Sequence, residues 1–505
     1  MMKIQLAPEW QGTPTLFRKT WQHIGNIDQF RWLSRADVLN QLRMARDEIG
    51  VRYVRAAAMY SPELCVWDYD IVDWRECGEK SRRVNWQLVD IALEGLLALG
   101  LKPIYTTCFT PLGMTDDTVS CCWPDNNPVG MPRDLTQWQD FVAGGIRHHI
   151  ERFGIEEVRS WYFECWNEPN LSPCFFGGTK EDFFQLWSAT WRAVKSVDPA
   201  LRLGGPSTAR SEWISDFLDF TAEAGTPPDY LIAHIYNNDS EDAPLSPFEG
   251  PSNHQGKDSP HFASGVIRGL RKKLDQRGWK GEVHWNEWGR SFFLHDPLRE
   301  TVLESAFVIK TMAQSAQDAD AFSYWCLSDI YNQGGFQSSE FQGNYGMLSL
   351  HGLRKPAWMA HQLLSRLGTN RLPVNGGDEL VGAVATREGS HAKMLVYAYP
   401  PPSDAVPTHI EVRVAWPFGK PALTRLGAVE NNIIATWKGM GAPAYPTPDQ
   451  LTQLRAVNTL KPASEDEIHV EATPEGPVAV FELECPGAAL LESQAVTNKQ
   501  GCKRE

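Results

Sequence analysis

Two glutamates in this 505-residue sequence follow directly on aromatic runs that are typical of β-strands. Glu168 comes after the run at 161–167, and Pro169 behind it can stop a strand and fix the turn. Glu287 closes a second such run at 283–286, 119 residues further along the chain (287 − 168 = 119). Two carboxyl groups held about 5–5.5 Å apart can cleave a glycosidic bond, because one attacks the anomeric carbon while the other protonates the leaving oxygen. The sequence therefore predicts a pair of carboxylates that could flank one glycosidic bond.

The elements between about residues 20 and 370 have to bring these two positions together. Short β-like runs alternate there with longer helical patterns, a rhythm typical of a parallel sheet covered by helices. We predict strands at 23–27, 51–55, 101–106, 158–165, 201–205, 230–235, 283–287 and 321–325. We predict helices at 34–49, 84–99, 136–153, 179–196, 211–224, 262–277, 297–317 and 356–367. The first helix is expected to be capped by Ser34 and to end at Gly50.

These eight strand–helix units predict an α/β fold, a (β/α)8 TIM barrel, which we place at residues 16–370. The C-terminal ends of all barrel strands face one mouth, so Glu168 on strand four and Glu287 on strand seven can flank the same substrate. The alternative is an open doubly wound sheet. That fold often carries a glycine-rich nucleotide loop, and the sequence has neither G-x-G-x-x-G nor a P-loop.

The pattern changes after about residue 370. Residues 409–416 and 480–485 alternate between apolar and polar side chains, and turn residues separate such runs. This period of two is typical of antiparallel strands and predicts an appended antiparallel β-sandwich domain at 371–497. The stretch 371–377 is interpreted as the linker, and residues 1–15 are a candidate for one more strand of the sandwich. The polar tail at 498–505 is expected to fray.

Composition narrows the classes of partner. Lysine and arginine number 48 against 62 aspartates and glutamates, a formal net charge of −14, which repels nucleic acids and anionic lipids. No segment resembles a secretory signal or the roughly 18 apolar residues of a membrane span, so we expect a cytoplasmic protein. The ten cysteines show no C-x-x-C pair and no zinc-like spacing with histidine. We therefore expect an oligosaccharide or glycoside as the substrate, no nucleic acid or membrane partner, no metal and no cofactor; the oligomeric state stays open.

The residues around the two glutamates also resemble a known family. The motif Asn167-Glu168-Pro169 together with Glu287 is similar to the clan of retaining (β/α)8 glycosidases, and most similar to family-39 glycoside hydrolases, the β-xylosidase and α-L-iduronidase group. Further matching motifs lie at 204–206, 234–236, 324–329, 345–348 and 355–357. The resemblance covers roughly residues 20–370, and an appended β-sandwich is also a trait of this family.

The resemblance implies a role for each matching residue. Glu168 would be the acid/base and Glu287 the nucleophile. Asn167 would bind the 2-hydroxyl of the sugar, and Tyr236 would hydrogen-bond Glu287 and help keep it ionised. The other expected contacts to substrate come from His234, Trp325 as a stacking floor, and Glu340.

Two segments depart from the family pattern, and both departures bear on which sugar the protein would bind. Residues 55–58 read Arg-Ala-Ala-Ala, without a histidine expected there, and Asp28 and Gln29 replace a glycine-rich loop and could bind hydroxyls. The loop at 108–133 either walls the pocket, which would favour exo action, or covers helix ends. The favoured activity is an exo-β-xylosidase that releases xylose from short xylo-oligosaccharides in xylan degradation. The alternatives are a β-galactosidase, a β-glucosidase, an arabinose- or uronate-specific enzyme, or an inactive sugar-binding protein.

Overall fold

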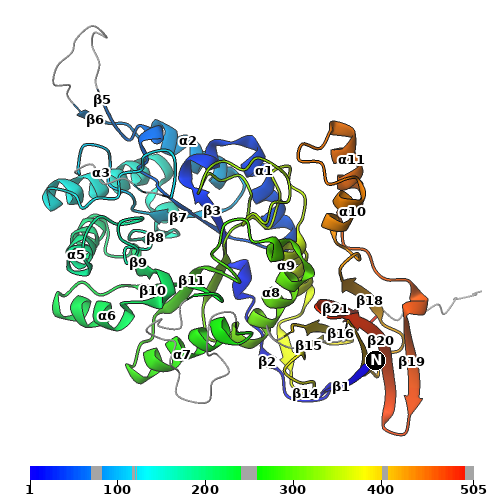
Figure 1. Ribbon diagram of the computed structural model, residues 1–505. Coiled ribbons are helices and arrows are strands. Elements are labelled where there is room, and N and C mark those ends of the chain that lie inside the picture. Colours follow the sequence, from blue (N-terminus) through cyan, green and yellow to red (C-terminus); the bar gives the residue numbers. More distant parts are fainter. Residues whose placement is uncertain (70–81, 116–119, 121, 240–258, 401–407, 495–505) are drawn as a thin grey trace, which may run out of the picture.

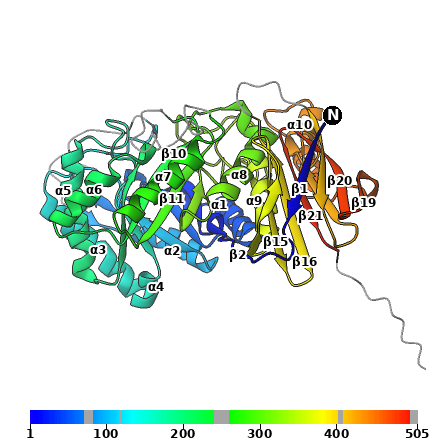
Figure 2. The same cartoon turned by 90° about the horizontal axis from the view of Figure 1, so that it is seen from below.

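The computed structural model describes residues 1–69, 82–115, 120, 122–239, 259–400 and 408–494. A barrel surrounded by helices fills one side of the molecule, and two sheets packed face to face fill the other, as both ribbon views show (Figures 1 and 2). The polar tail expected at 498–505 lies outside the described residues. Within the described part, no helix is long and apolar enough to cross a membrane.

The predicted barrel is confirmed as an eight-stranded parallel sheet with the order β12-β11-β10-β9-β8-β7-β4-β3. Its strands are β3 (Ile24–Gln29), β4 (Tyr53–Ala57), β7 (Lys102–Thr106), β8 (Tyr162–Glu164), β9 (Arg202–Thr208), β10 (Tyr230–Tyr236), β11 (Glu282–Gly289) and β12 (Ala321–Tyr324). Beyond the end of β12, the backbone N–H of Leu327 donates to the carbonyl of Asn26 on β3 over 2.8 Å. The two edge strands therefore lie together and nearly close the barrel.

Helices follow the strands and cover the outside of the barrel (Figure 1). They are α1 (Ala36–Met44), α2 (Gln87–Ala98), α3 (Leu135–Phe153), α4 (Ile155–Arg159), α5 (Lys180–Val197), α6 (Ile214–Glu223), α7 (Phe262–Gln276), α8 (Val302–Ser315) and α9 (Pro356–Arg366). Local sequence explains several ends. Thr179 and Asp182 form a capping box on α5, and Gly50 ends the first helical segment with φ +96°.

Two local expectations in this part were wrong. Ser34 does not cap α1, because its hydroxyl donates to the carbonyl of Arg31 while α1 begins at Ala36 without a side-chain cap. The fourth strand is shorter than residues 158–165, because the start of that range belongs to α4 and a turn, and β8 spans only Tyr162–Glu164. Glu168 therefore lies on a loop beyond the strand rather than at its last position.

Among the described residues, eleven strands form the second lobe. One sheet has the order β14-β1-β17-β20-β19 and the other β18-β21-β16-β15-β13-β2. Their bounds are β1 (Met2–Pro8), β2 (Thr15–Leu16), β13 (Asn370–Leu372), β14 (Val374–Gly376), β15 (Val381–Glu388), β16 (His391–Ala398), β17 (His409–Ala415), β18 (Ala422–Leu426), β19 (Ile468–Thr473), β20 (Gly476–Glu484) and β21 (Gly487–Glu492). A continuous apolar core fills the space between the sheets.

Three details of this lobe differ from the prediction. The stretch 371–377 is not a linker, since it contains most of β13 and all of β14. The N-terminal segment does add a strand, but β1 pairs with β17 in parallel, so the sandwich is not antiparallel throughout. Two helices, α10 (Ile433–Gly439) and α11 (Pro448–Val457), interrupt the strands. The capping box of Thr447 and Gln450 was a local signal for α11.

Candidate active site

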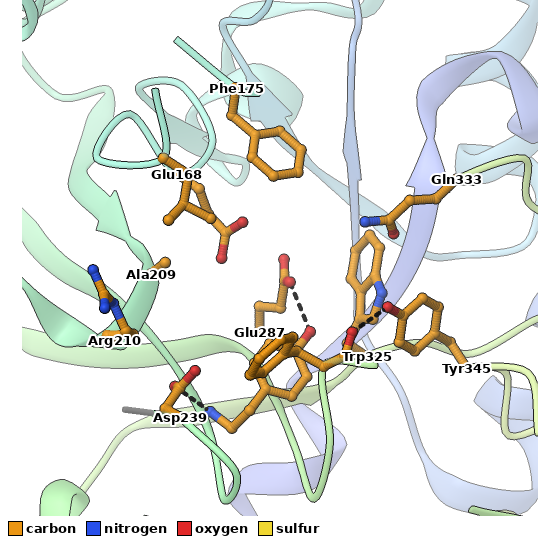
Figure 3. A pocket seen from close by; sticks show the side chains of 12 residues that line it. Glu168, Phe175, Ala209, Arg210, Asp239, Glu287, Trp325, Gln333 and Tyr345 are labelled. Carbon is orange, nitrogen blue, oxygen red and sulfur yellow. Dashed lines mark hydrogen bonds between the residues drawn. The ribbon is translucent and has the colours of Figure 1, made fainter. Parts of the chain in front are cut away.

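A cavity of about 370 Å³ opens at the C-terminal ends of the barrel strands, and both predicted glutamates line it (Figure 3). Their carboxyl groups point toward each other across the cavity, and the ring of Phe175 lies above both in this view (Figure 3). The lining residues are Glu168, Leu171, Phe175, Ala209, Arg210, Tyr236, Asp239, Glu287, Phe292, Trp325, Gln333 and Tyr345. The fold therefore brings together two carboxyls that are 119 residues apart in sequence (287 − 168 = 119).

Glu168 is held by the turn that follows β8. Its backbone has φ +46°, a left-handed conformation that is uncommon for a residue other than glycine. The backbone N–H of Glu168 donates to the carbonyl of Ser207 over 2.8 Å, which ties this turn to β9. Oε1 of Glu168 lies 3.0 Å from Nδ1 of His234, and burial raises the pKa of Glu168 to about 7, against the charges of Arg55 and Arg210.

Glu287 lies on β11 and has different partners. The hydroxyl of Tyr236 donates to Oε1 over 2.7 Å, and Nη1 of Arg55 donates to Oε2 over 3.2 Å. Burial and the nearby charge of Glu168 raise the pKa of Glu287 to about 7, while the charge of Arg55 and the hydrogen bond from Tyr236 oppose the rise. Because Glu287 accepts two hydrogen bonds from its neighbours, it is the carboxyl better suited to remain ionised.

The two carboxyls are close enough to act on one bond. A carboxylate oxygen of Glu168, one of Glu287 and a ring nitrogen of His234 all lie within 4.8 Å of one another. Two buried carboxylates at this distance repel each other, so the pair keeps one negative charge and one proton near neutral pH. A charged carboxylate beside a protonated one is the arrangement that the first step of double-displacement glycoside cleavage requires.

Arg55, which the sequence analysis did not assign to the site, lies beneath the pair on β4. Its side chain is fully buried and makes a two-pronged contact with Glu164, from Nε and Nη2 at 2.9 Å each. It also donates to Oδ1 of Asn167 over 2.5 Å. Burial alone would lower the pKa of Arg55, but the charge of Glu164 raises it above its ordinary value. A lone arginine within an otherwise apolar strand was the signal in the sequence.

Of the five other residues expected to bind substrate, four lie at the cavity or directly beneath it and one does not. Tyr236 and Trp325 line the cavity. Asn167 and His234 lie just beneath it, where Asn167 hydrogen-bonds Arg55 and His234 contacts Glu168. Glu340 does not join them. It is buried away from the cavity lining and accepts hydrogen bonds from the backbone N–H and the ring of His351.

Asp28 and Gln29 also form hydrogen bonds with other residues of the protein. Both oxygens of Asp28 accept hydrogen bonds from tryptophan indoles, Oδ1 from Trp123 over 2.9 Å and Oδ2 from Trp32 over 3.3 Å. The amide of Gln29 donates to Oδ1 of Asn332 over 3.3 Å. Neither residue lines the cavity, so the structure does not support the expected contacts of Asp28 and Gln29 with hydroxyls.

The loop at 108–133 affects the cavity only indirectly. None of its described residues lines the cavity, but Trp123 packs edge-on against Phe175, which does, with ring centroids 5.4 Å apart. The hydrogen bond from Trp123 to Asp28 anchors this contact to β3. The loop therefore supports a wall of the cavity through Phe175.

Four more lining residues were given no role by the sequence analysis, although Tyr345 belongs to the family motif at 345–348. Arg210 and Asp239 stand on the side of the cavity near Glu168, and Gln333 and Tyr345 stand opposite (Figure 3). Asp239 accepts a hydrogen bond from the backbone N–H of Tyr236 over 2.8 Å, and burial raises its pKa to about 7. These residues come from loops after the strands, where position depends on the whole fold.

Two groups of side chains among the described residues have the geometry to share a cation. One is Glu168, His234 and Glu287. The other is Asp90, His148 and His149, between α2 and α3, where Nε2 of His148 lies 2.9 Å from Asp90 Oδ2. The first group already forms the hydrogen bonds described above, and the second lies on helices outside the barrel.

Comparison with known proteins agrees with this geometry. The family model for Glycosyl hydrolases family 39 matches residues 2–474, nearly the whole chain. The chain belongs to glycoside hydrolase family 39. This confirms the predicted resemblance, and with it the predicted class of glycosidase.

The relatives of this family-39 glycosidase include proteins named for two different activities. It is 29% identical over 438 residues to the β-xylosidase of Geobacillus stearothermophilus, covering 85% of this chain and 84% of that enzyme. It is 26% identical over 381 residues to human α-L-iduronidase, covering 64% of this chain and 55% of that protein. A solved structure of a monomeric β-xylosidase from Caulobacter crescentus CB15 superimposes with a TM-score of 0.81 at 25% identity, covering 98% of this chain and 100% of that one.

Proposed function

We propose that this family-39 glycosidase is a retaining, exo-acting β-xylosidase that uses Glu287 as the nucleophile and Glu168 as the acid/base. The observation that carries the proposal is the opposed pair of buried carboxyls, with oxygens within 4.8 Å and with unlike partners. Arg55 and Tyr236 hydrogen-bond Glu287, and His234 contacts Glu168. Asn167, held by Arg55, is the proposed partner of the 2-hydroxyl, and Trp325 is the proposed stacking floor.

Two steps follow from these roles. In the first, a carboxylate oxygen of Glu287 attacks the anomeric carbon, the glycosidic bond breaks, and Glu168 gives its proton to the leaving oxygen. Glu287 is then esterified and uncharged, so the pKa of Glu168 falls and its carboxylate can act as a base. In the second step, Glu168 takes a proton from water, whose oxygen attacks the same carbon and releases Glu287. Net retention of configuration is the result.

The choice of xylose rests on likeness to proteins named β-xylosidases. The exo mode is supported by the compact cavity of about 370 Å³, which suits the end of a glycan better than its middle. We propose short xylo-oligosaccharides from xylan degradation as the substrates. The cytoplasmic location and the domain bounds at 16–370 and 371–497 also stay predictions, which cell fractionation and limited proteolysis can test.

A panel of 4-nitrophenyl glycosides tests the sugar. We expect kcat/KM to be highest for the β-xyloside, and the β-glucoside, β-galactoside and arabinoside to be weaker. Proton NMR at early times should show β-xylose as the first product. α-Xylose as the first product would refute the retaining mechanism, and a preference for another sugar would refute only the proposed substrate.

One observation favours a second candidate, a uronate-specific enzyme. Arg210 lines the cavity, and its Nε is buried without a hydrogen-bond partner among the described residues. Its Nη2 pairs with Glu212 over 2.5 Å, which holds a guanidinium at the cavity wall, where it could meet a substrate carboxylate. Human α-L-iduronidase is among the relatives. Including α-L-iduronide and β-glucuronide substrates in the panel decides between the two candidates.

A further inference from the structure

A chain of buried side chains connects Arg55 to the acid/base through three intermediates. Arg55 contacts Glu164, and Ser207 Oγ lies 2.5 Å from Glu164 Oε1. The same hydroxyl oxygen lies 3.2 Å from Nε2 of His234, whose Nδ1 lies 3.0 Å from Glu168 Oε1. Glu164, Ser207 and His234 are each 0% exposed, so water does not compete for these contacts.

The charges at the start of the chain set the direction of its hydrogen bonds. Burial alone would raise the pKa of Glu164, but Arg55 lowers it below its ordinary value, so Glu164 is a carboxylate and only accepts. The proton of the Ser207 hydroxyl must therefore point to Glu164, since the contact is 2.5 Å. The oxygen of Ser207 then has only lone pairs to offer His234. Nε2 of His234 consequently carries the hydrogen in this pair.

The other ring nitrogen follows from the neutrality of His234. Burial lowers the pKa of His234 to about 4, so near neutral pH the ring holds one proton, which is on Nε2. Nδ1 is then a bare acceptor, 3.0 Å from Glu168 Oε1. A hydrogen bond forms between these atoms only when Glu168 is the protonated partner.

We infer that Ser207, oriented by Glu164, is a positioning residue that fixes His234 as the Nε2–H tautomer and so holds the proton of Glu168 in the resting enzyme. This inference rests on the proposed acid/base role of Glu168. It gives Glu164 and Ser207, neither of which lines the cavity, a part in the first chemical step.

The backbone at Ser207 is an independent argument. Ser207 has φ +58°, in the left-handed region where glycine costs least. Glycine would also retain the backbone carbonyl that accepts the N–H of Glu168. The feature that serine adds at this position is its hydroxyl, the group that joins Glu164 to His234.

Removing that hydroxyl has a predictable effect on acidity. Without it, His234 is free to adopt the Nδ1–H tautomer, which donates to Glu168 and favours its charged form. The other charged groups facing Glu168 are Arg55, Arg210, Glu287 and Asp239, and all four remain in place. The pKa of the acid/base should therefore fall, by about one pH unit for the gain of one charge-assisted hydrogen bond.

The test compares Ser207→Gly with a matched control, Ser211→Gly. Ser211 is also buried with a left-handed backbone, φ +55°, but its hydroxyl donates to the backbone carbonyl of His234 rather than to the ring. For a glycoside with an unactivated leaving group, Ser207→Gly should move the basic limb of kcat/KM about one pH unit lower. For the 2,4-dinitrophenyl glycoside, which needs no acid, kcat/KM should change less than about twofold. Ser211→Gly should leave the limb unmoved.

A second measurement needs no substrate. In protein with ¹⁵N-labelled histidine, the ring of wild-type His234, assigned by its loss in His234→Asn, should show a protonated Nε2 and a bare Nδ1. Ser207→Gly should show the other tautomer or a mixture. An unmoved limb in Ser207→Gly, an equal loss on both substrates, or a wild-type Nδ1–H would overturn the inference. Failure of wild-type enzyme to hydrolyse any glycoside would instead refute the proposed function, and the ring spectrum would still decide the tautomer.

Discussion

Replacing Glu168 with alanine tests whether the two carboxyls have different roles in catalysis. The change removes the group 3.0 Å from Nδ1 of His234 but leaves Glu287 with its hydrogen bonds from Arg55 and Tyr236. The variant should therefore keep its nucleophile and lose only proton transfer. Because the removed side chain lines the cavity rather than the core, we expect substrate binding and folding to persist.

The size of the loss should depend on the leaving group. A positioned general acid contributes about 10²- to 10⁴-fold, or about 3–5 kcal/mol, when the leaving oxygen needs a proton. For xylobiose or methyl xyloside, kcat/KM of Glu168→Ala should fall by that factor. For 2,4-dinitrophenyl β-xyloside, the first step should stay within about tenfold of wild type, because this phenolate leaves unprotonated. The second step still lacks its base, so a burst of dinitrophenolate should precede a slow steady state.

The pH dependence gives an independent magnitude. Burial places the pKa of Glu168 at about 7, so at pH 8 only about one tenth of the wild-type enzyme carries the acid proton. Wild-type kcat/KM on unactivated substrates should fall about tenfold per pH unit above this value. In Glu168→Ala that basic limb should be absent.

Azide distinguishes the roles. In Glu168→Ala, azide should attack the covalent intermediate and give a β-xylosyl azide, with faster turnover. In Glu287→Gly, no such intermediate forms, and azide should attack from the vacated side to give the α-azide. The reasoning is refuted if Glu168→Ala loses the same factor on both classes of leaving group. An α-azide from Glu168→Ala would show that the two roles are reversed.

Three further changes test the surroundings of the pair. In Tyr236→Phe, Glu287 loses its 2.7 Å hydrogen bond, so its charged form is less favoured; the acidic limb of kcat/KM should move to higher pH and kcat/KM should fall about 10- to 100-fold. Wild-type limbs in this variant would contradict the contact. Arg55→Met leaves the buried Glu164 carboxylate unpaired and should lower the free energy of unfolding in urea by about 3–5 kcal/mol. A wild-type midpoint would contradict that pairing. Burial raises the folded-state pKa of Asp28 to about 6, above its ordinary 3.8, so its contribution to stability is present below pH 3.8 and is lost as pH rises through about 6. The unfolding free energy of Asp28→Asn minus that of wild type should therefore increase by about 1 kcal/mol between pH 5 and pH 7.5. A difference that stays constant over this range would contradict the raised pKa.

The sequence was sufficient for the fold and for the two carboxyls because both are encoded locally. Alternating strand and helix patterns fix a barrel, and a glutamate at the end of an aromatic run can be recognised without knowing its neighbours. Asn167, Tyr236 and Trp325 were found by resemblance to family motifs, and the fold places them at or beneath the cavity.

The misplaced residues show where local patterns fail. Asp28 and Glu340 are acidic residues, yet each accepts hydrogen bonds from other parts of the protein: Asp28 from Trp123, 95 residues away, and Glu340 from His351, 11 residues away. Arg55 was passed over for the opposite reason, since its partners come from other strands. A polar side chain is free for substrate only if no other part of the chain uses it, and that depends on tertiary structure.

The same dependence explains how two identical side chains could take the different roles proposed for them. Glu168 and Glu287 are both buried and both have a pKa raised to about 7, so burial alone does not assign the proton. The assignment comes from their partners: Arg55 and Tyr236 offer hydrogens to Glu287, whereas His234 offers Glu168 a bare nitrogen. Arg55 also bonds Glu164, which sets the direction of the chain through Ser207. One buried arginine therefore favours the charge on Glu287 directly. Its charge also lowers the pKa of Glu168 directly, while the chain through Glu164 and Ser207 acts in the opposite sense, so its removal should shift both limbs of the pH profile.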